Sequence, residues 1–367
     1  MDTLHITESL CRVGGVETFL HHYLSGDFRS SAASLLDSGR GERWRGLRPN
    51  RMAGAYVLRA NAKRWVPVVK HIVFHNFAGL SMLGGTIKHE RRTLFLHTNS
   101  EDVFTLLPRR LPFLDAIVTS GADLKANLLD RFPSLDRAVF AIEYPLNELF
   151  FCPLARVPPE RLTIGYAGRV ETKQKQVHRL ANLSNHLLAK GIDFRLEVAG
   201  SGSSLDFLRR SIPQHRLRFL GNLSTPKLAN AFAAWDFLII CSDYETGPLV
   251  AIEAMAAGVM PILPRIPCQA SALVAKLGGP LYSHGDMASA ADVIVSLLSS
   301  REALGTWRWR YQQEVKGRTL ASFISDFRGI LESIASRQSI SRPPAIPTGL
   351  SELLPFTLRR WSTDHLR

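Results

Sequence analysis

The sequence predicts an α/β protein made of two doubly wound, Rossmann-like domains that face a central cleft. Three observations support this fold class. Short apolar runs alternate with helical segments, a Pro-rich stretch at residues 151–161 interrupts the alternation, and a second alternating series follows it. Strands separated by helices form parallel sheets covered on both faces. The 367 residues, 46% of them hydrophobic, are sufficient for two complete cores.

The first domain, expected over residues 1–155 on the acceptor side, contains six short apolar runs that predict strands. The best candidate for a membrane span, residues 71–87, contains His75, Asn76 and paired glycines, so it is interpreted as a strand followed by a helix. The start of the chain lacks the basic and apolar regions of a signal peptide, which favours a cytoplasmic protein. The six runs are residues 3–7, 31–36, 71–76, 93–98, 116–121 and 138–145.

The second domain is expected over residues 156–335, with the linker between the two domains in the Pro-rich stretch. Residues 336–367 begin as a Pro- and Ser-rich tail and end in an expected closing helix that could return to the first domain. Five apolar runs predict the strands of the second domain, at residues 162–168, 195–200, 217–221, 237–242 and 259–263.

The formal net charge of +13 suggests an anionic partner: nucleic acid, a membrane surface or a diphosphate substrate. Basic residues gather at residues 40–70, where interleaved tryptophans favour a membrane-surface segment. A solvated loop and helix face is the alternative. No nucleic-acid-binding motif accompanies the charge, so no nucleic acid is expected. The four cysteines are scattered without a C-x-x-C pair, which indicates a reducing compartment and no structural zinc.

Two carboxylates, Glu245 and Glu253, lie in the otherwise apolar stretch CSDYETGPLVAIEAMAAGVMPI at residues 241–262. This stretch predicts a strand end, a loop, a helix with Pro248 in its first turn and Gly258 at its end, and another strand. Ligands of parallel sheets bind outside the carboxyl ends of the strands, and a helix N-terminus suits a phosphate. The arrangement therefore suggests a sugar-nucleotide site. The alternative is a buried helix capped by a loop glutamate.

A basic loop follows the expected strand that ends at Gly168. Its side chains Arg169, Lys173 and Lys175 could bind a diphosphate and neutralise the charge that develops on a departing nucleotide. A solvated basic loop is the alternative. The chain contains no D-x-D motif, so no metal is expected and basic side chains are the favoured partners of the phosphates.

Glycines and histidines mark three further strand ends. Gly200 belongs to a G-x-G turn, and Gly14 and Gly15 precede a helix that is expected to begin near Val16. Each glycine turn could bring the backbone close to a ligand or serve only as a turn. His97 ends an expected strand, where its side chain could bind donor hydroxyls or an acceptor, although a structural histidine is the alternative.

Together, the motifs GGVE, GYAGRVETKQK, VAGSG, RFLGNLS and SDYETGPLVAIEAMAAG resemble those of the GT-B glycosyltransferases, specifically glycosyltransferase family 4, the group 1 enzymes. They cover most of the chain in the family's order, and the E-x7-E segment is the most specific. The resemblance implies a GT-B fold and retaining, metal-independent transfer of a sugar from a nucleoside-diphosphate donor to a glycan or lipid-linked acceptor. It also implies no cofactor beyond the donor, and a role in bacterial surface polysaccharide or glycolipid synthesis at the inner face of the membrane.

The resemblance also implies roles for individual residues. Glu253 holds the ribose, Glu245 and His97 approach the donor sugar, and Arg169 with Lys175 binds the diphosphate. Gln176 follows Lys175 where the family often has glycine, and Lys173 competes for the role of Lys175. The remaining donor-binding positions implied are Gly15, Gly168, Gly200, Gly247, Pro248, Leu249 and Val250.

No residue of the sequence is evident as a nucleophile for double displacement. Front-face attack is therefore favoured, with the acceptor hydroxyl giving its proton to the leaving phosphate. Three other functions stay open: a GT-B sugar-nucleotide epimerase, a non-catalytic GT-B subunit of a transferase complex, and a nucleic-acid-binding protein that exploits the charge.

Overall fold

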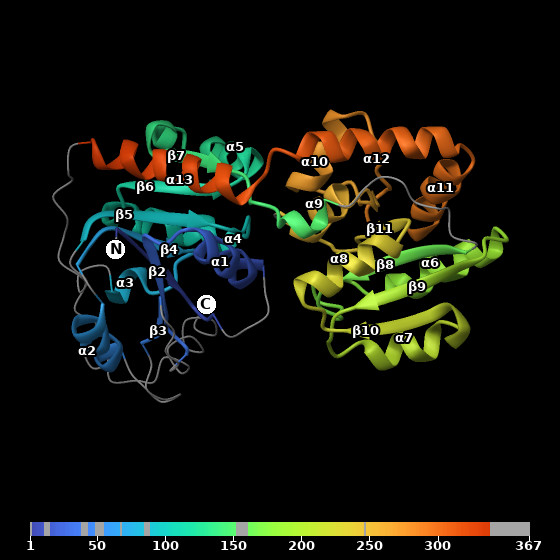
Figure 1. Ribbon diagram of the computed structural model, residues 1–367, viewed down its shortest axis with the longest axis horizontal. Coiled ribbons are helices and arrows are strands. Elements are labelled where there is room, and N and C mark those ends of the chain that lie inside the picture. Colours follow the sequence, from blue (N-terminus) through green and yellow to red (C-terminus); the bar gives the residue numbers. More distant parts are fainter. Residues whose placement is uncertain are drawn as a thin grey trace. The chain divides into compact units, whose positions relative to one another are not determined.

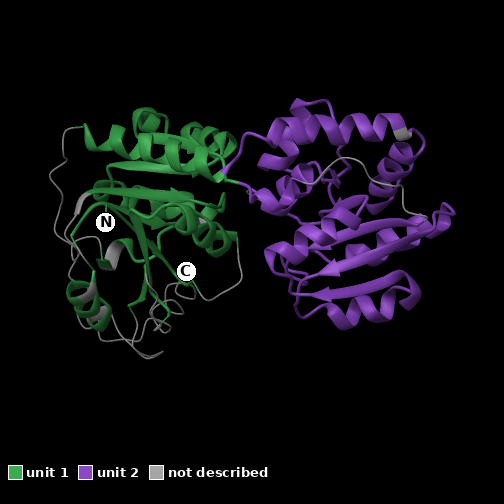
Figure 2. Ribbon diagram, viewed as in Figure 1, with its two compact units in different colours: residues 1–145, 320–367 green, residues 146–319 purple. Residues whose placement is uncertain are grey.

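The computed structural model describes residues 2–10, 15–37, 43–47, 55–66, 68–83, 89–151, 161–245 and 247–337. The chain forms two compact units (Figure 2). The first unit combines the chain up to Pro145 with the chain from Leu320 onward, and the second spans residues 146–319. The sequence placed the first division at residues 155/156 and the second at 335/336, so both divisions lie earlier in the structure.

The first unit is built on a seven-stranded parallel sheet of order β3-β2-β1-β4-β5-β6-β7 (Figure 1). All six strands predicted for this domain are present. The short strand β3 was not predicted, because it lies inside the basic segment that was interpreted as loop and helix. The strands are β1 Thr3–Thr7, β2 Ser30–Ser34, β3 Trp44–Gly46, β4 Val69–His75, β5 His89–Leu96, β6 Ala116–Ser120 and β7 Val139–Ile142.

Helices cover this sheet, and the last of them comes from the far end of the chain. The helices are α1 Gly15–Gly26, α2 Ala55–Trp65, α3 Leu80–Leu83, α4 Glu101–Leu106, α5 Ala122–Arg131 and α13 Leu320–Ala335, with 3-10 turns η1 Leu107–Arg109, η2 Leu111–Phe113 and η3 Pro133–Ala138. Helix α13 lies against α1, β5 and β7.

An apolar face explains why α13 belongs to the first unit. Phe323 and Phe327 are buried, and both rings pack against Tyr23 of α1. Arg328 forms an ion pair with the buried carboxylate of Asp27 in the same unit. The sequence assigned residues 320–335 to the second domain, because periodicity identifies a helix but not the sheet on which it packs. Most of the tail expected at residues 336–367 lies outside the described residues.

The second unit is a five-stranded parallel sheet of order β10-β9-β8-β11-β12 with helices around it. Its five predicted strands are confirmed, as β8 Leu162–Ala167, β9 Phe194–Ala199, β10 Leu217–Gly221, β11 Phe237–Ile239 and β12 Met260–Ile262. Its helices are α6 Arg179–Ala189, α7 Leu205–Ser211, α8 Thr225–Ala234, α9 Leu249–Ala256, α10 Gln269–Lys276, α11 Met287–Leu298 and α12 Arg301–Val315, with 3-10 turns η4 Glu148–Phe150 and η5 Gln214–Arg216.

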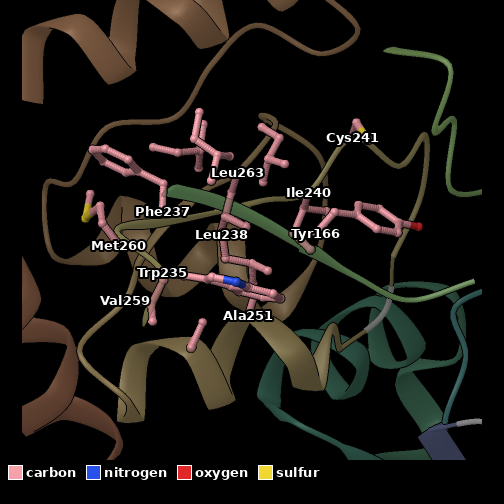
Figure 3. Close-up of a cluster of buried hydrophobic side chains, with 14 of the residues drawn as sticks. Tyr166, Trp235, Phe237, Leu238, Ile240, Cys241, Ala251, Val259, Met260 and Leu263 are labelled. Carbon is pink, nitrogen blue, oxygen red and sulfur yellow. The ribbon is translucent and has the colours of Figure 1, made fainter. Parts of the chain in front are cut away.

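A buried indole anchors the middle of this unit. Trp235 is fully buried, and Figure 3 shows its ring beside Leu238 and Ala251. Its Nε1 donates to Glu197 Oε2 at 2.9 Å, which satisfies its only polar group. Gly165 of β8 leaves room for the ring, because a Cβ there would lie 1.9 Å from it. Close packing of Trp235 therefore fixes the position of β8 and β11, and with it the points from which the loops after these strands begin.

The basic segment at residues 40–70 is only partly described, since residues 38–42, 48–54 and 67 lie outside the described ranges. Leu47 and Leu58 are fully buried in the core of the first unit, and Trp44 Nε1 donates to Ser34 Oγ at 3.0 Å. These apolar side chains therefore serve the fold, while Lys63 and Arg64 of α2 are exposed. Among the described residues no helix combines the length and apolarity that a membrane crossing requires.

Candidate functional site

Two loops meet at the carboxyl edge of the five-stranded sheet. The β8 loop (residues 168–178) follows β8, and the β11 loop (residues 240–248) follows β11, its neighbour in the sheet. The Asp243 N–H donates to the Gln174 carbonyl at 3.0 Å, and Gln174 Nε2 donates to the Tyr244 carbonyl at 3.1 Å. The basic loop and the first carboxylate predicted from the sequence are therefore neighbours in one site.

Lys175 and Glu245 form the central contact between these loops. Lys175 Nζ lies 2.5 Å from Glu245 Oε1, and the side chains are only 18% and 7% exposed. Ser242 Oγ donates to the same oxygen at 2.6 Å. Charge-assisted bonds of this kind are strong when water is largely excluded. Lys175 is thus the lysine at Glu245, whereas the side chain of Lys173 is exposed to solvent.

Arg169 presents a solvent-accessible cation beside this pair. Its side chain is 61% exposed, and its guanidinium donates to Gln174 Oε1 at 2.5 Å and lies 3.7 Å from Glu171 Oε1. Its backbone carbonyl accepts a 2.6 Å bond from the buried Tyr166 hydroxyl. The backbone of Arg169 is therefore fixed to the sheet while its guanidinium remains able to meet an anion.

Glu253 lies in the second turn of α9, beside the same edge. The helix begins after Pro248, so this proline is the N-cap, whereas the sequence predicted it in the first turn. Gly258 ends the helix, as predicted, and has a φ of 68°. Glu253 is partly buried, and no donor among the described residues bonds its carboxylate. Burial raises the pKa of Glu253 to about 7. A carboxyl group without a protein partner is able to accept hydroxyl donors from a ligand.

The glycine turns hold the loops beyond β8 and β9 together. Gly200 has a φ of 136°, and a Cβ on it would lie 1.9 Å from the Gly168 carbonyl oxygen. Gly168 N–H donates to the Ala199 carbonyl at 3.0 Å, and Val170 N–H to the Ser201 carbonyl at 2.9 Å. The glycines therefore permit two backbones to approach closely, whatever they also offer to a ligand. Of the other predicted positions, Gly247 precedes α9, and Leu249 and Val250 form its first turn.

A cluster around Asp243 was not predicted from the sequence. Its carboxylate accepts a short bond from Gln176 Nε2, pairs with Arg179 at 2.6 Å and lies 3.1 Å from His284 Nε2. Burial alone would raise the pKa of Asp243, but the bonds from Arg179, His284 and Gln176 outweigh it and lower the pKa. Asp243 follows β11 almost directly, so the reasoning that selected Glu245 could have selected it.

The remaining predicted site residues belong to the first unit. Gly15 is the first residue of α1, and a Cβ on it would have no neighbour within 4 Å. Gly14 lies outside the described residues. His97 follows β5 and is buried, with its Nε2 2.6 Å from His75 Nδ1 and its Nδ1 bonded to the Tyr144 hydroxyl. Both ring nitrogens of His97 are therefore engaged inside this unit.

His97 is one end of a row of three buried histidines, which was not predicted from the sequence. His75 Nε2 lies 2.9 Å from His5 Nδ1, so the rings of β1, β4 and the end of β5 are joined in series. Desolvation lowers the pKa of all three, to about 4 for His5, to about 3 for His97 and well below the usual value for His75. The three rings are consequently neutral at physiological pH.

Part of the chain that contains this site matches a family model of known proteins. Residues 155–311 match the family model "Glycosyl transferases group 1". The chain is 27% identical over 196 residues to a glycogen synthase of Mycobacterium tuberculosis, covering 52% of this chain and 47% of that protein. It is 27% identical over 191 residues to a GDP-mannose-dependent alpha-mannosyltransferase of Mycolicibacterium smegmatis, covering 50% and 46%. The chain thus spans about half the length of these curated relatives.

The fold is also that of solved structures. HepE of Anabaena in complex with UDP-glucose superimposes with a TM-score of 0.72 at 15% identity, covering 91% of this chain and 100% of that one. An identity this low shows a common fold alone, and it is the GT-B fold that the sequence motifs indicated.

Proposed function

Because residues 155–311 match the family model of group 1 glycosyl transferases and the chain has the GT-B fold, we propose that the protein is a retaining, metal-independent glycosyltransferase. It would move a sugar from a nucleoside-diphosphate donor to a glycan or lipid-linked acceptor. The observation that carries this proposal is the group of side chains at one sheet edge: the Lys175–Glu245 pair, the accessible Arg169 and the carboxyl of Glu253, which no described residue bonds.

In this proposal each group meets one part of the donor. Glu253 accepts the ribose hydroxyls, and the N–H groups of Gly247, Leu249 and Val250 face the sugar and phosphate at the start of α9. Pro248 contributes no N–H donor. Gly15 and His97 of the first unit remain assigned to the donor through the family resemblance alone.

Binding of the donor would exchange the partners of Lys175 and Glu245. The Lys175 amine would turn from Glu245 to the diphosphate, which would leave Glu245 free to accept a hydroxyl of the sugar. As the bond between the anomeric carbon and the phosphate oxygen breaks, negative charge grows on the diphosphate beside Lys175 and Arg169. Preorganised cations at such a position stabilise a transition state by about 3 kcal/mol. The acceptor hydroxyl bonds to the anomeric carbon and passes its proton to the leaving phosphate.

A binding screen tests the donor site. Ligand-detected NMR against UDP, GDP, ADP and their sugar conjugates is expected to identify one donor that binds the wild-type protein. Glu253→Ala and Arg169→Ala should each weaken that donor by about 10-fold or more, because each removes a charged hydrogen-bond partner. Arg210→Ala and Glu302→Ala are matched controls, since both side chains are exposed on helices of the same unit, and they should bind like the wild type. Absence of binding across the panel would contradict the proposal.

We further propose that the exposed basic side chains of residues 40–70 attract an anionic membrane surface, where a lipid-linked acceptor is presented. Support comes from the exposure of Lys63 and Arg64 on α2, while the apolar side chains Leu47 and Leu58 are used in the core. The attraction is then electrostatic, and each cation adds about 1 kcal/mol.

Sedimentation with liposomes tests this attraction. Vesicles that contain anionic lipid should retain the protein, high salt should release it, and Lys63→Ala with Arg64→Ala should weaken retention. Equal retention by neutral vesicles would refute an electrostatic attachment.

A further inference from the structure

Gln176, directly after Lys175, has a backbone conformation that its residue type disfavours. Its φ is 50°, in the left-handed region where glycine is comfortable and residues with a long side chain are rare. Among the described residues other than glycine, only Asn76 shares a positive φ, and asparagine tolerates that region better. A bond elsewhere must therefore hold Gln176 in place.

The side chain of Gln176 supplies that bond. Its Nε2 donates to Oδ2 of Asp243 in the β11 loop. Asp243 is itself fixed, because Oδ1 pairs with Arg179 at 2.6 Å and lies 3.1 Å from His284 Nε2. Arg179 also donates to the Cys241 carbonyl at 2.8 Å, so it ties the same loop a second time. The amide of Gln176 is thus anchored on a carboxylate that two other side chains, Arg179 and His284, also hold.

The bonds between the two loops enclose Lys175 on both sides. On the side before Lys175, the Gln174 carbonyl accepts from the Asp243 N–H at 3.0 Å. The carbonyl of Lys175 itself lies 3.5 Å from Cys241 Sγ. After it comes the Gln176–Asp243 bond. With its backbone held in this way, Lys175 directs its amine to Glu245 at 2.5 Å.

We propose that Gln176 and Asp243 are positioning residues, which clasp the β8 loop to the β11 loop and so hold the Lys175 amine at Glu245. The strained backbone of Gln176 is retained because its side chain makes this clasp. What the held amine acts on rests on the proposed function, namely the diphosphate of the donor. The clasp itself is a property of the protein without ligand.

Two variants separate the clasp from the backbone strain. Gln176→Gly and Gln176→Asn both suit a positive φ, but the first has no amide, and the second is one methylene shorter and cannot reach Asp243 as glutamine does. If the side chain only compensates for strain, both variants should behave like the wild type or better. If it positions Lys175, both should lose that positioning while they stay folded, with a melting temperature within about 2 °C.

Reductive methylation of the native full-length protein, read by mass spectrometry, reports on the amine directly. In the wild type Lys175 should react more slowly than the exposed Lys173, which is an internal reference. Both variants should raise the Lys175 rate by about fivefold or more and change the Lys173 rate less than about twofold, because only Lys175 loses its fixed partner. Unchanged protection of Lys175 in both variants would overturn the proposal.

Kinetics of donor cleavage then connects the clasp to catalysis. With the donor identified in the binding screen, kcat for release of the nucleoside diphosphate should fall about 10-fold in each variant, while KM changes less than about threefold, because a misplaced amine meets the developing charge poorly. If the wild type binds no nucleotide, the proposed function fails, and the methylation rates alone decide the clasp. If the Lys175 rate rises but kcat is unchanged, the amine is held by the clasp but its role in donor cleavage is refuted.

Discussion

Lowering the pH from about 7.5 to about 5.5 is expected to destabilise the first unit by about 3 kcal/mol through the buried His5 and His97, with a further loss in the same direction through His75. Desolvation lowers the pKa of His5 to about 4 and that of His97 to about 3, and it lowers the pKa of His75 as well. In the unfolded chain these rings have ordinary pKa values of about 6.5. Below that pH the unfolded state binds protons that the folded state does not bind. The free energy of unfolding therefore falls by about 1.4 kcal/mol for each histidine and each pH unit.

Hydrogen exchange of peptides from the first unit, measured across this pH range, checks the prediction. Replacement of one ring of the row by His5→Phe should reduce the loss of stability over this pH range by about 1 kcal/mol, whatever its constant cost in packing. His186→Gln is the control, since that histidine is exposed on α6 of the second unit, and it should leave the pH dependence of the first unit unchanged. A His5→Phe variant with the pH dependence of the wild type would contradict the account.

Glu253→Gln is expected to stabilise the second unit above neutral pH although it removes a ligand-binding group. Burial raises the pKa of Glu253 to about 7, well above the ordinary value of a glutamate. The cost of this carboxyl is absent below about pH 4.5, where both states are protonated. It grows as the pH rises and is complete above the folded pKa of about 7, at up to about 3 kcal/mol.

The pH dependence isolates this effect from the constant cost of a glutamine in the same place. The stability of Glu253→Gln relative to the wild type should rise by about 2 kcal/mol between about pH 5 and about pH 8, because the histidines are common to both proteins and cancel. Urea unfolding of the protein, followed by hydrogen exchange of peptides from the second unit, gives this difference in stability. Glu302→Gln, at an exposed position of α12, should show no such rise. A difference in stability that does not depend on pH would mean that burial does not raise the pKa of the Glu253 carboxyl group.

The sequence indicated the strands and the positions of the loops that follow β8 and β11, because both follow from local patterns. Apolar runs bounded by turn residues predicted eleven of the twelve strands that the described residues form, and the carboxyl ends of β8 and β11 brought Lys175 to Glu245 as parallel topology requires. The assignment of α13 to the second domain was wrong, because it depends on a contact between residues far apart in the chain. The periodicity of its apolar face predicts a helix, but it does not show that this face packs against Tyr23 of α1.

Other features of the site could not be predicted, because they depend on contacts between distant side chains. Lys173 and Lys175 are equivalent in a sequence, and only the conformation of the β8 loop distinguishes the exposed amine from the paired one. In the same way His5, His75 and His97 are unrelated by spacing and become neighbours only through the register of β1, β4 and β5. The unfavourable φ of Gln176 likewise has no local signal in the sequence, apart from a glutamine at a position where the resembled family often has glycine.

In the proposed function, the carboxyl edge of the second unit holds a nucleoside diphosphate. The decisive experiment is a crystal structure of the protein soaked with whichever of UDP, GDP or ADP binds it. We expect the ribose hydroxyls at the Glu253 carboxylate, the diphosphate between Arg169 and the start of α9, and the Lys175 amine moved from Glu245 to a phosphate oxygen. A nucleotide bound elsewhere, with the Lys175–Glu245 pair intact, would contradict it.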